Sequence, residues 1–214
     1  MSRYNTVLFD LDGTLTDSSL GITRCAAMTL DHYGIAYDSL DALRVFIGPP
    51  LSASFPAWGV PAEETDNAIR LFRSRYTTVG KFENAPYDGI SDLLIKLKKE
   101  GYRLIVATSK PESVAAEILD KFELSQYFDR ICGASADHSR ETKDAVISYV
   151  LAQEKSDIRP VMVGDTSFDV TGAGVHHIDC IGVLWGFGTE ESMIAAGACG
   201  IADSMQSLYE LITQ

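Results

Sequence analysis

Residues 7–16 read VLFDLDGTLT, an apolar run that ends in two aspartates and a glycine. A continuous run of branched and aromatic residues is typical of a strand buried on both faces of a sheet. Asp10 and Asp12 lie two positions apart, so in an extended chain both side chains point to one face. Two carboxylates held that close repel each other unless a cation is present. Two interpretations stay open: a strand-end Asp-Gly turn, or a divalent-metal site with a nucleophilic aspartate.

The composition indicates a folded globular protein. The chain has 214 residues, of which 46% are hydrophobic and 22% are charged. That length suits one large domain, or a core with a smaller companion. The formal net charge is -12, which repels nucleic-acid backbones and anionic membranes. We therefore expect neither a nucleic acid nor a membrane as partner.

The cysteines and the apolar segments indicate a cellular location. The four cysteines are Cys25, Cys132, Cys180 and Cys199. No two of them form a CxxC pair and they fall in apolar stretches, which predicts buried reduced thiols. The chain begins without a charged leader and an apolar run after it, and no apolar stretch approaches the length of roughly 18 residues that a membrane span needs. We expect a cytoplasmic protein.

Short apolar segments recur along the chain and predict the strands of one sheet. The expected strands are Thr6–Phe9, Arg103–Ala107, Arg130–Cys132, Val161–Val163 and Cys180–Leu184. Segments with a helical apolar stripe lie between them, at Ile90–Glu100, Val114–Phe122 and Lys143–Gln153. Strands that alternate with helices predict an α/β fold with a doubly wound, mostly parallel sheet.

One interval breaks this alternation. Between Ser18 and Lys81 the sequence shows no strand pattern and predicts helices instead. They are expected at 20–33, 39–47 and 62–79, with a short irregular piece around 51–58 and glycines between the segments. We predict a small all-helical domain at 17–82, inserted after the first strand, and an α/β core made of 1–16 and 83–214.

Polar residues follow the other predicted strands where a ligand would bind, at the carboxyl ends of the sheet. Thr108 and Ser109 follow one strand, Asp165 and Asp169 follow another, and Lys143 opens the helix before the latter. Carboxylates from two strand ends suit Mg²⁺. A carboxylate nucleophile can form an aspartyl-phosphate, and a lysine and hydroxyls can stabilise phosphoryl oxygens. The set predicts phosphoryl transfer.

Each of these pieces also has a structural explanation. Thr108 and Ser109 suit a helix N-cap before Pro111. Lys143 alone suits a solvated surface position, and Gly164-Asp165 suits a strand-end turn. Their convergence at one sheet edge favours a site.

The motif order resembles a known family. Asp-x-Asp-Gly-Thr at 10–14, a Thr/Ser pair at 108–109, Lys143, and Gly-Asp-x-x-x-Asp at 164–169 together resemble the haloacid dehalogenase superfamily of phosphatases. The likeness is greatest to the branch of phosphoglycolate phosphatases, whose helical cap follows the first motif directly. It covers essentially the full length, and it implies a Rossmann-like core with a cap at 17–82.

The resemblance implies a role for each acid. Asp10 would be the nucleophile and would also bind Mg²⁺ through its other oxygen. Asp12 would be the general acid and base, with its backbone carbonyl on the metal. Asp165 would be a metal ligand. Asp169 would be a ligand, or an acid that positions Lys143 or a metal-bound water.

The resemblance also implies a group that binds the substrate phosphate: Thr108, Ser109, Lys143 and Gly13. Thr108 is preferred to Ser109 as the catalytic hydroxyl because it directly follows the apolar run.

The lysine motif departs from the family pattern. Many relatives have prolines beside this lysine, whereas residues 139–143 contain none, so Arg140 is an alternative phosphate cation. Lys143 is preferred because Ser139 and Thr142 can cap the helix that it begins.

We expect a Mg²⁺-dependent phosphatase that is a monomer or a homodimer. Its substrate would be a small phosphorylated metabolite: phosphoglycolate, a sugar phosphate or a nucleoside monophosphate. A phosphomutase of the same family is the alternative, because it would share the aspartyl-phosphate. A phosphoacceptor signalling module is less favoured, since such receivers are about half this length and lack a helical insertion.

Overall fold

The computed structural model describes residues 3–137, 139–154 and 157–214. The chain divides into two compact units. One joins Met1–Thr16 to Pro86–Gln214, and the other is Asp17–Ala85. The chain crosses between them in two short strands, β2 (Thr16–Asp17) and β3 (Ala85–Pro86), which pair with each other.

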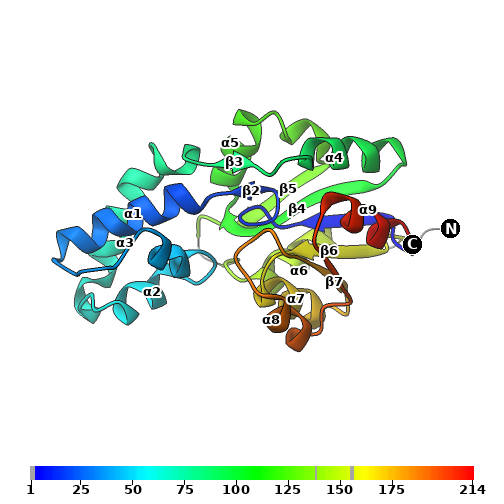
Figure 1. The fold of residues 1–214 in the computed structure, drawn as a ribbon. Coiled ribbons are helices and arrows are strands. Elements are labelled where there is room, and N and C mark those ends of the chain that lie inside the picture. Colours follow the sequence, from blue (N-terminus) through cyan, green and yellow to red (C-terminus); the bar gives the residue numbers. More distant parts are fainter. Residues whose placement is uncertain (1–2, 138, 155–156) are drawn as a thin grey trace. The chain divides into compact units, whose positions relative to one another are not determined.

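A six-stranded sheet organises the first unit (Figure 1). Its strand order is β5-β4-β1-β6-β7-β8, and every pairing between neighbours is parallel. The strands are β1 (Thr6–Phe9), β4 (Arg103–Pro111), β5 (Arg130–Ala134), β6 (Pro160–Gly164), β7 (Asp179–Val183) and β8 (Gly200–Ala202). The predicted α/β class with a doubly wound parallel sheet is confirmed.

Helices cover both faces of this sheet. They are α4 (Ile90–Lys99), α5 (Glu112–Lys121), α6 (Lys143–Gln153), α7 (Ser167–Val175), α8 (Glu190–Ala196) and α9 (Met205–Thr213). A short 3₁₀ turn, Ser125–Tyr127, lies between α5 and β5. Helices α4, α5 and α9 pack on one face, and α6, α7 and α8 on the other (Figure 1).

The packing of strand β1 explains why residues 7–9 form a continuous apolar run. Val7 and Phe9 belong to the core cluster under α4, α5 and α9, whereas Leu8 belongs to the cluster under α6 and α7. All three side chains are fully buried. Because successive strand residues point to opposite faces, a strand covered on both sides has no position that faces solvent.

The second unit is helical. It contains α1 (Ser19–His32), α2 (Leu51–Ala57) and α3 (Thr65–Tyr76), with 3₁₀ turns at Asp41–Phe46, Ala62–Glu64 and Gly80–Phe82. Aromatic rings form its core, since the ring centroids of Phe46 and Phe55 lie 5.1 Å apart and those of Phe55 and Phe72 lie 6.2 Å apart. The segment predicted as a helix at 39–47 is a 3₁₀ turn, and the segment at 62–79 is divided into a 3₁₀ turn and α3. The piece expected to be irregular around 51–58 forms helix α2.

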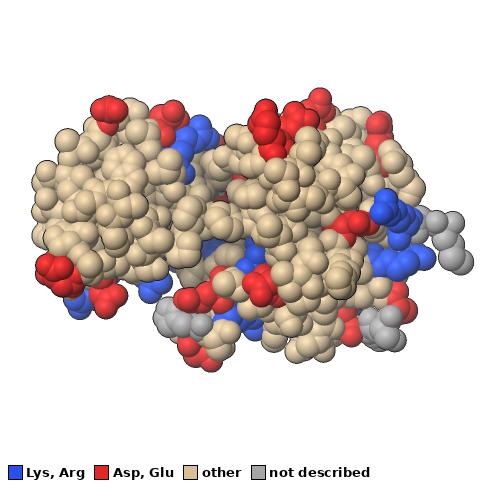
Figure 2. Space-filling view, turned by 90° about the horizontal axis from the view of Figure 1, so that it is seen from below, with Lys and Arg blue, Asp and Glu red and all other residues tan. Residues whose placement is uncertain are grey.

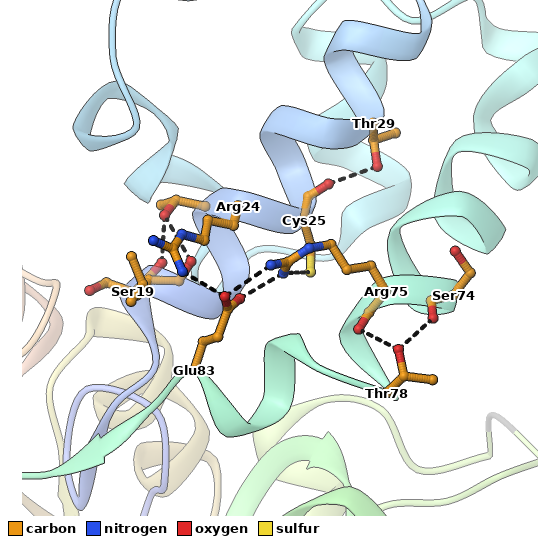
Figure 3. Close-up of polar contacts among 10 residues, drawn as sticks. Ser19, Arg24, Cys25, Thr29, Ser74, Arg75, Thr78 and Glu83 are labelled. Atoms are coloured by element: carbon orange, nitrogen blue, oxygen red, sulfur yellow. Dashed lines mark hydrogen bonds and ion pairs between the residues drawn. The ribbon is translucent and has the colours of Figure 1, made fainter.

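An ion-pair network closes the helical unit near both ends of its chain (Figure 3). The carboxylate of Glu83 lies 2.6 Å from Arg24 of α1 and 2.7 Å from Arg75 of α3. The Glu83 carbonyl also accepts a hydrogen bond of 3.0 Å from the N–H of Gly21. Arg75 and Arg24 hold the pKa of Glu83 below its usual range. The last turn of the unit is thereby tied to its first helix.

Several elements differ from the sequence prediction. Strand β4 continues past Ala107 to Pro111, with a shift in its pairing to β5 between those residues. Helices α7, α8 and α9 and strand β8 were not predicted. Helix α7 carries a capping box in which Thr166 and Asp169 exchange hydrogen bonds, a signal readable as the sequence Thr-Ser-Phe-Asp. The prediction of four buried thiols is wrong for Cys199, which is exposed.

Charge is dispersed on the surface. The chain has 30 acidic against 18 basic residues, and acidic side chains are spread over the face shown in Figure 2 rather than gathered in one patch. Among the described residues, none of the helices has both the length and the apolar character needed to cross a membrane.

Two isoleucines test this packing. We expect Ile118→Ala, at a fully buried position of α5, to lower the free energy of unfolding by about 2–5 kcal/mol, because it removes buried methyl groups and leaves a cavity. The matched Ile194→Ala, at a 55% exposed position of α8, should change it by less than about 0.5 kcal/mol. Urea denaturation of both variants measures the difference, and equal losses would contradict the burial assigned to α5.

Candidate active site

Lys143 joins three segments of the α/β unit at the carboxyl ends of the central strands. Its ammonium lies 2.8 Å from Oδ1 of Asp10 and 2.8 Å from Oδ1 of Asp169, and it donates a hydrogen bond of 2.9 Å to the carbonyl of Ala107. Its side chain is only 6% exposed. Burial lowers the pKa of Lys143, but the charges of Asp10 and Asp169 outweigh burial and raise it above its usual range. The lysine is buried and charged, not a solvated surface group.

Three aspartates gather around this position. Carboxylate oxygens of Asp10, Asp165 and Asp169 all lie within 4.8 Å of one another. Asp165 and Asp169 are fully buried. Burial raises the pKa of Asp165 well above its usual range, and the charges of Asp169 and Asp10 raise it further. Burial also raises the pKa of Asp169, although Lys143 opposes the rise. One lysine leaves an excess of negative charge here.

This donor set fits a divalent cation. Hard carboxylate oxygens from two strand ends are the ligands that Mg²⁺ prefers, and three buried or half-buried carboxylates surround a single lysine here. Asp10, Asp165 and Asp169 are the residues that would hold it. Asp12 was predicted to contribute its backbone carbonyl rather than its side chain, and its carboxylate is not part of this group; the carbonyl stays a predicted ligand.

The Asp165 carboxylate is held by residues to which the sequence analysis assigns no role in the site. Thr14 donates its hydroxyl to Oδ1 at 3.1 Å, and the N–H of Phe187 donates to Oδ2 at 2.8 Å. The indole of Trp185 donates to the carbonyl of Thr14 at 3.1 Å. Residues 185–187 follow β7, so inspecting the end of that strand, as of the others, would have found them.

Gly13 lies against the same carboxylate. Its φ is +85°, and a Cβ at this position would overlap Oδ2 of Asp165. A glycine is required both by the left-handed backbone and by the close approach. The structure gives Gly13 this packing role. Its contact with substrate stays a prediction.

Thr108 and Ser109 occupy different surroundings. Thr108 is buried and its hydroxyl accepts a hydrogen bond of 3.3 Å from the N–H of Lys110. Ser109 is exposed, because the strand alternation of β4 continues through these residues. Neither caps the next helix: α5 has Pro111 at its N-cap position and no side-chain capping bond.

Arg140, the alternative phosphate cation, is engaged elsewhere. Its Nε donates to the carbonyl of Gly133 at 2.8 Å, and its Nη2 lies 2.9 Å from the Glu112 carboxylate. Its guanidinium also lies 3.7 Å from the centroid of the Tyr149 ring. Helix α6 begins at Lys143, with Thr142 as N-cap residue but no side-chain capping bond. The geometry therefore brings Lys143, not Arg140, to the aspartates.

Asp169 divides its two oxygens between two tasks. Oδ2 accepts hydrogen bonds from the N–H and the hydroxyl of Thr166, at 3.0 and 2.8 Å, and so caps α7. Oδ1 faces Lys143. The helix cap thus fixes the orientation of the acid that holds the lysine.

Several known proteins are similar to this chain in sequence and in fold. The sequence model of the haloacid dehalogenase-like hydrolases matches residues 7–183. A 5'-nucleotidase of Pseudomonas aeruginosa is 40% identical over 195 residues, which cover 90% of this chain and 88% of that protein. A phosphoglycolate phosphatase of Caulobacter vibrioides is 30% identical and covers 90% of this chain and 84% of its own length. The predicted resemblance to the phosphoglycolate-phosphatase branch is confirmed.

Two further matches extend the comparison. The tyrosine-protein kinase PtkA of Mycobacterium tuberculosis is 44% identical over 187 residues, or 85% of this chain, and the match spans 62% of that protein's length. The crystal structure of a predicted phosphatase from Clostridium acetobutylicum superposes with a TM-score of 0.91 at 43% identity, covering 98% of each chain.

Metal binding should depend on pH in a defined direction. Raised carboxyl pKa values mean that the metal-free folded protein binds protons more tightly than the unfolded chain, so its stability falls as pH rises through those values. Mg²⁺ binds only the ionised carboxylates. We expect saturating Mg²⁺ to raise Tm by a few degrees at about pH 8 and by less at about pH 5.5.

The controls for this experiment are two aspartate-to-asparagine variants. Asp165→Asn should lose the Mg²⁺-dependent rise in Tm, whereas Asp92→Asn, at an exposed position of α4, should keep it. Scanning fluorimetry with and without Mg²⁺ measures both. A rise in Tm that Asp165→Asn retains would place the ion elsewhere.

Proposed function

We propose that this chain, which belongs to the haloacid dehalogenase-like hydrolase family, is a Mg²⁺-dependent phosphatase that acts through an aspartyl-phosphate at Asp10. One observation carries the proposal: a buried lysine lies between Asp10 and Asp169, within a cluster of three carboxylates. Such a cluster is costly to bury unless it binds charge. A divalent cation would supply the positive charge that the cluster lacks, and together with Lys143 it would hold the negatively charged phosphate monoester beside Asp10.

The reaction has two steps in this proposal. A carboxylate oxygen of Asp10 bonds to phosphorus as the bond from phosphorus to the leaving oxygen breaks, and Asp12 gives that oxygen its proton. A water oxygen then bonds to phosphorus and passes a proton to Asp12, the Asp10–phosphorus bond breaks, and phosphate leaves. Both aspartates return to their starting state.

The other residues act by charge and position. When bound, Mg²⁺ would neutralise the carboxylates and the phosphate, so that the anion can approach Asp10. Lys143 orients Asp10 and adds positive charge beside the phosphoryl oxygens. Thr108, buried at the end of β4, is the hydroxyl that would donate to one of those oxygens.

For the substrate we propose a small phosphorylated metabolite and place nucleoside 5'-monophosphates first. The 5'-nucleotidase relative supports this order because it is 40% identical over most of both chains. Phosphoglycolate ranks next, on the relatives of that name. Sugar phosphates are the third substrate class that the sequence predicts. With a sugar phosphate as substrate the enzyme could also be a phosphomutase, in which the phosphoryl group of the aspartyl-phosphate passes to a sugar rather than to water. We propose a cytoplasmic location.

A second candidate is phosphoryl transfer to tyrosine. The relative that carries the name tyrosine-protein kinase is 44% identical, but the match covers 62% of its length. A phosphoacceptor signalling module is disfavoured, since such receivers are about half this length and lack a helical insertion such as the unit Asp17–Ala85.

Loss of the nucleophile tests the mechanism. Asp10→Asn should lower kcat for 4-nitrophenyl phosphate by at least about 10³-fold, as removal of a nucleophile does in other covalent catalysts. EDTA should abolish the wild-type rate, and added Mg²⁺ should restore it. Asp92→Asn, the exposed control on α4, should retain wild-type activity. Full activity of Asp10→Asn, or in EDTA, would falsify the mechanism.

A substrate panel tests the proposed class. We expect kcat/KM for at least one nucleoside 5'-monophosphate to exceed that for phosphoglycolate and for hexose phosphates by about tenfold, a difference of about 1.4 kcal/mol in transition-state binding. Phosphate release measures all of them. Isomerisation of a sugar phosphate without release of phosphate would indicate the mutase, and ATP-dependent labelling of a tyrosine peptide would indicate the second candidate.

A further inference from the structure

A second buried lysine of the α/β unit has no part in the mechanism derived above. Lys110, near the end of β4, places its ammonium 2.6 Å from Oδ2 of Asp12. The lysine side chain is 6% exposed and that of Asp12 is 17% exposed. Lysine is rarely buried without a charged partner, so this pair is a built feature of the site. We propose, on the basis of the proposed function, that Lys110 is a positioning residue that holds Asp12 in the orientation required of the general acid.

The hydrogen-bonding capacity of lysine determines which oxygen of Asp12 can carry a proton. An ammonium group donates hydrogen bonds and accepts none. The Asp12 oxygen that Lys110 holds, Oδ2, therefore cannot carry the proton that a general acid delivers. Any proton on Asp12 lies on Oδ1.

Oδ1 is kept available. It is buried and has no hydrogen-bond partner among the residues that the structure describes. A buried oxygen without a partner costs free energy, and it persists where a ligand completes it. The leaving oxygen of a phosphate ester, which must come within hydrogen-bond distance of its acid, is such a partner. Lys110 thus selects which oxygen of Asp12 meets the substrate.

The backbone of Lys110 is itself fixed from the neighbouring strand. The pairing of β4 with β5 shifts between Ala107 and Pro111, and an irregularity of this kind re-aims side chains. Gly133 of β5 packs so closely there that a Cβ on it would lie 2.5 Å from the Lys110 carbonyl. The N–H of Gly133 donates to Glu112 at 3.2 Å, and Arg140 holds the same carboxylate. Arg140 therefore contributes to the site through β5 and this segment of β4.

The role of a general acid depends on the leaving group, and this gives a test that a loss of folding would not imitate. A good leaving group such as 4-nitrophenolate departs without a proton, whereas an alkoxide requires one. We measure kcat/KM, which includes cleavage of the phosphorus–oxygen bond, for 4-nitrophenyl, phenyl and ethyl phosphate. Lys110→Met should lose about tenfold on ethyl phosphate, a part of the 10²–10⁴ that acid–base catalysis contributes, and less than about twofold on 4-nitrophenyl phosphate.

A double variant shows whether Lys110 acts through Asp12. Asp12→Asn should show the same dependence on leaving group in stronger form, and adding Lys110→Met to it should cause no further loss. Lys110→Arg keeps a cationic donor and should recover part of the rate on ethyl phosphate. Lys98→Met, which breaks a lysine–aspartate pair of 2.9 Å on the surface of the same unit, should match wild type on all three esters.

The outcomes separate the two proposals. An equal loss on all three esters would assign Lys110 to phosphate binding or to folding, and no loss would leave it without a positioning role; either overturns the inference while phosphatase activity stands. Absence of Asp10-dependent hydrolysis in the wild type would overturn the proposed function and this inference with it. If Lys110→Met fails to fold, Lys110→Gln removes the charge with a polar side chain and is measured in the same series.

Discussion

The buried ammonium of Lys143 is the interaction on which the site depends. It lies 2.8 Å from both Asp10 and Asp169, and so joins the end of β1 to the start of α7 across the first turn of α6. Without a cation between them, these carboxylates would repel each other in a poorly solvated place. The lysine offsets only part of their charge, because Asp165 lies in the same cluster. The remaining negative charge is what a divalent cation would neutralise.

The sheet order explains how residues far apart in sequence reach this point. Strand β1 lies at the centre, with β4 on one side and β6 on the other. All three run parallel in register, so Phe9 lies beside Val106 and Val163. The next residues of each strand therefore emerge at one edge: Asp10 from β1, Thr108 from β4, and Asp165 beyond β6. Parallel pairing, more than any single contact, determines that these groups meet.

This dependence on strand ends also determines what the sequence could predict. Asp10, Lys143, Asp165 and Asp169 follow or precede strong apolar runs, and their meeting could be inferred from topology alone. Thr108 was preferred to Ser109 because it directly follows the apolar run, but the sequence did not show that β4 continues to Pro111 and that its alternation turns Ser109 outward. Thr14 belongs to the first motif, but the sequence did not show that its hydroxyl holds Asp165. Phe187 holds the same carboxylate through a backbone N–H, so its side-chain type gave no signal of this role. No feature of the sequence connected Lys110 to Asp12, because the lysine reaches that carboxylate from the part of β4 where the pairing with β5 shifts.

Asp10 and Asp12 are each paired with a different lysine, which reduces the repulsion between the two carboxylates. Two residues apart on one strand end, the carboxylates would otherwise compete for one cation. Lys143 approaches Asp10 from α6, and Lys110 approaches Asp12 from β4. Asp10 is thereby drawn into the cluster with Asp165 and Asp169, whereas Asp12 stays outside it. In the proposed mechanism the two acids differ in function because they differ in partner. Asp10, inside the cluster, would lie beside the cation that holds the phosphate, and Asp12, paired with a separate lysine, would keep one oxygen for the proton.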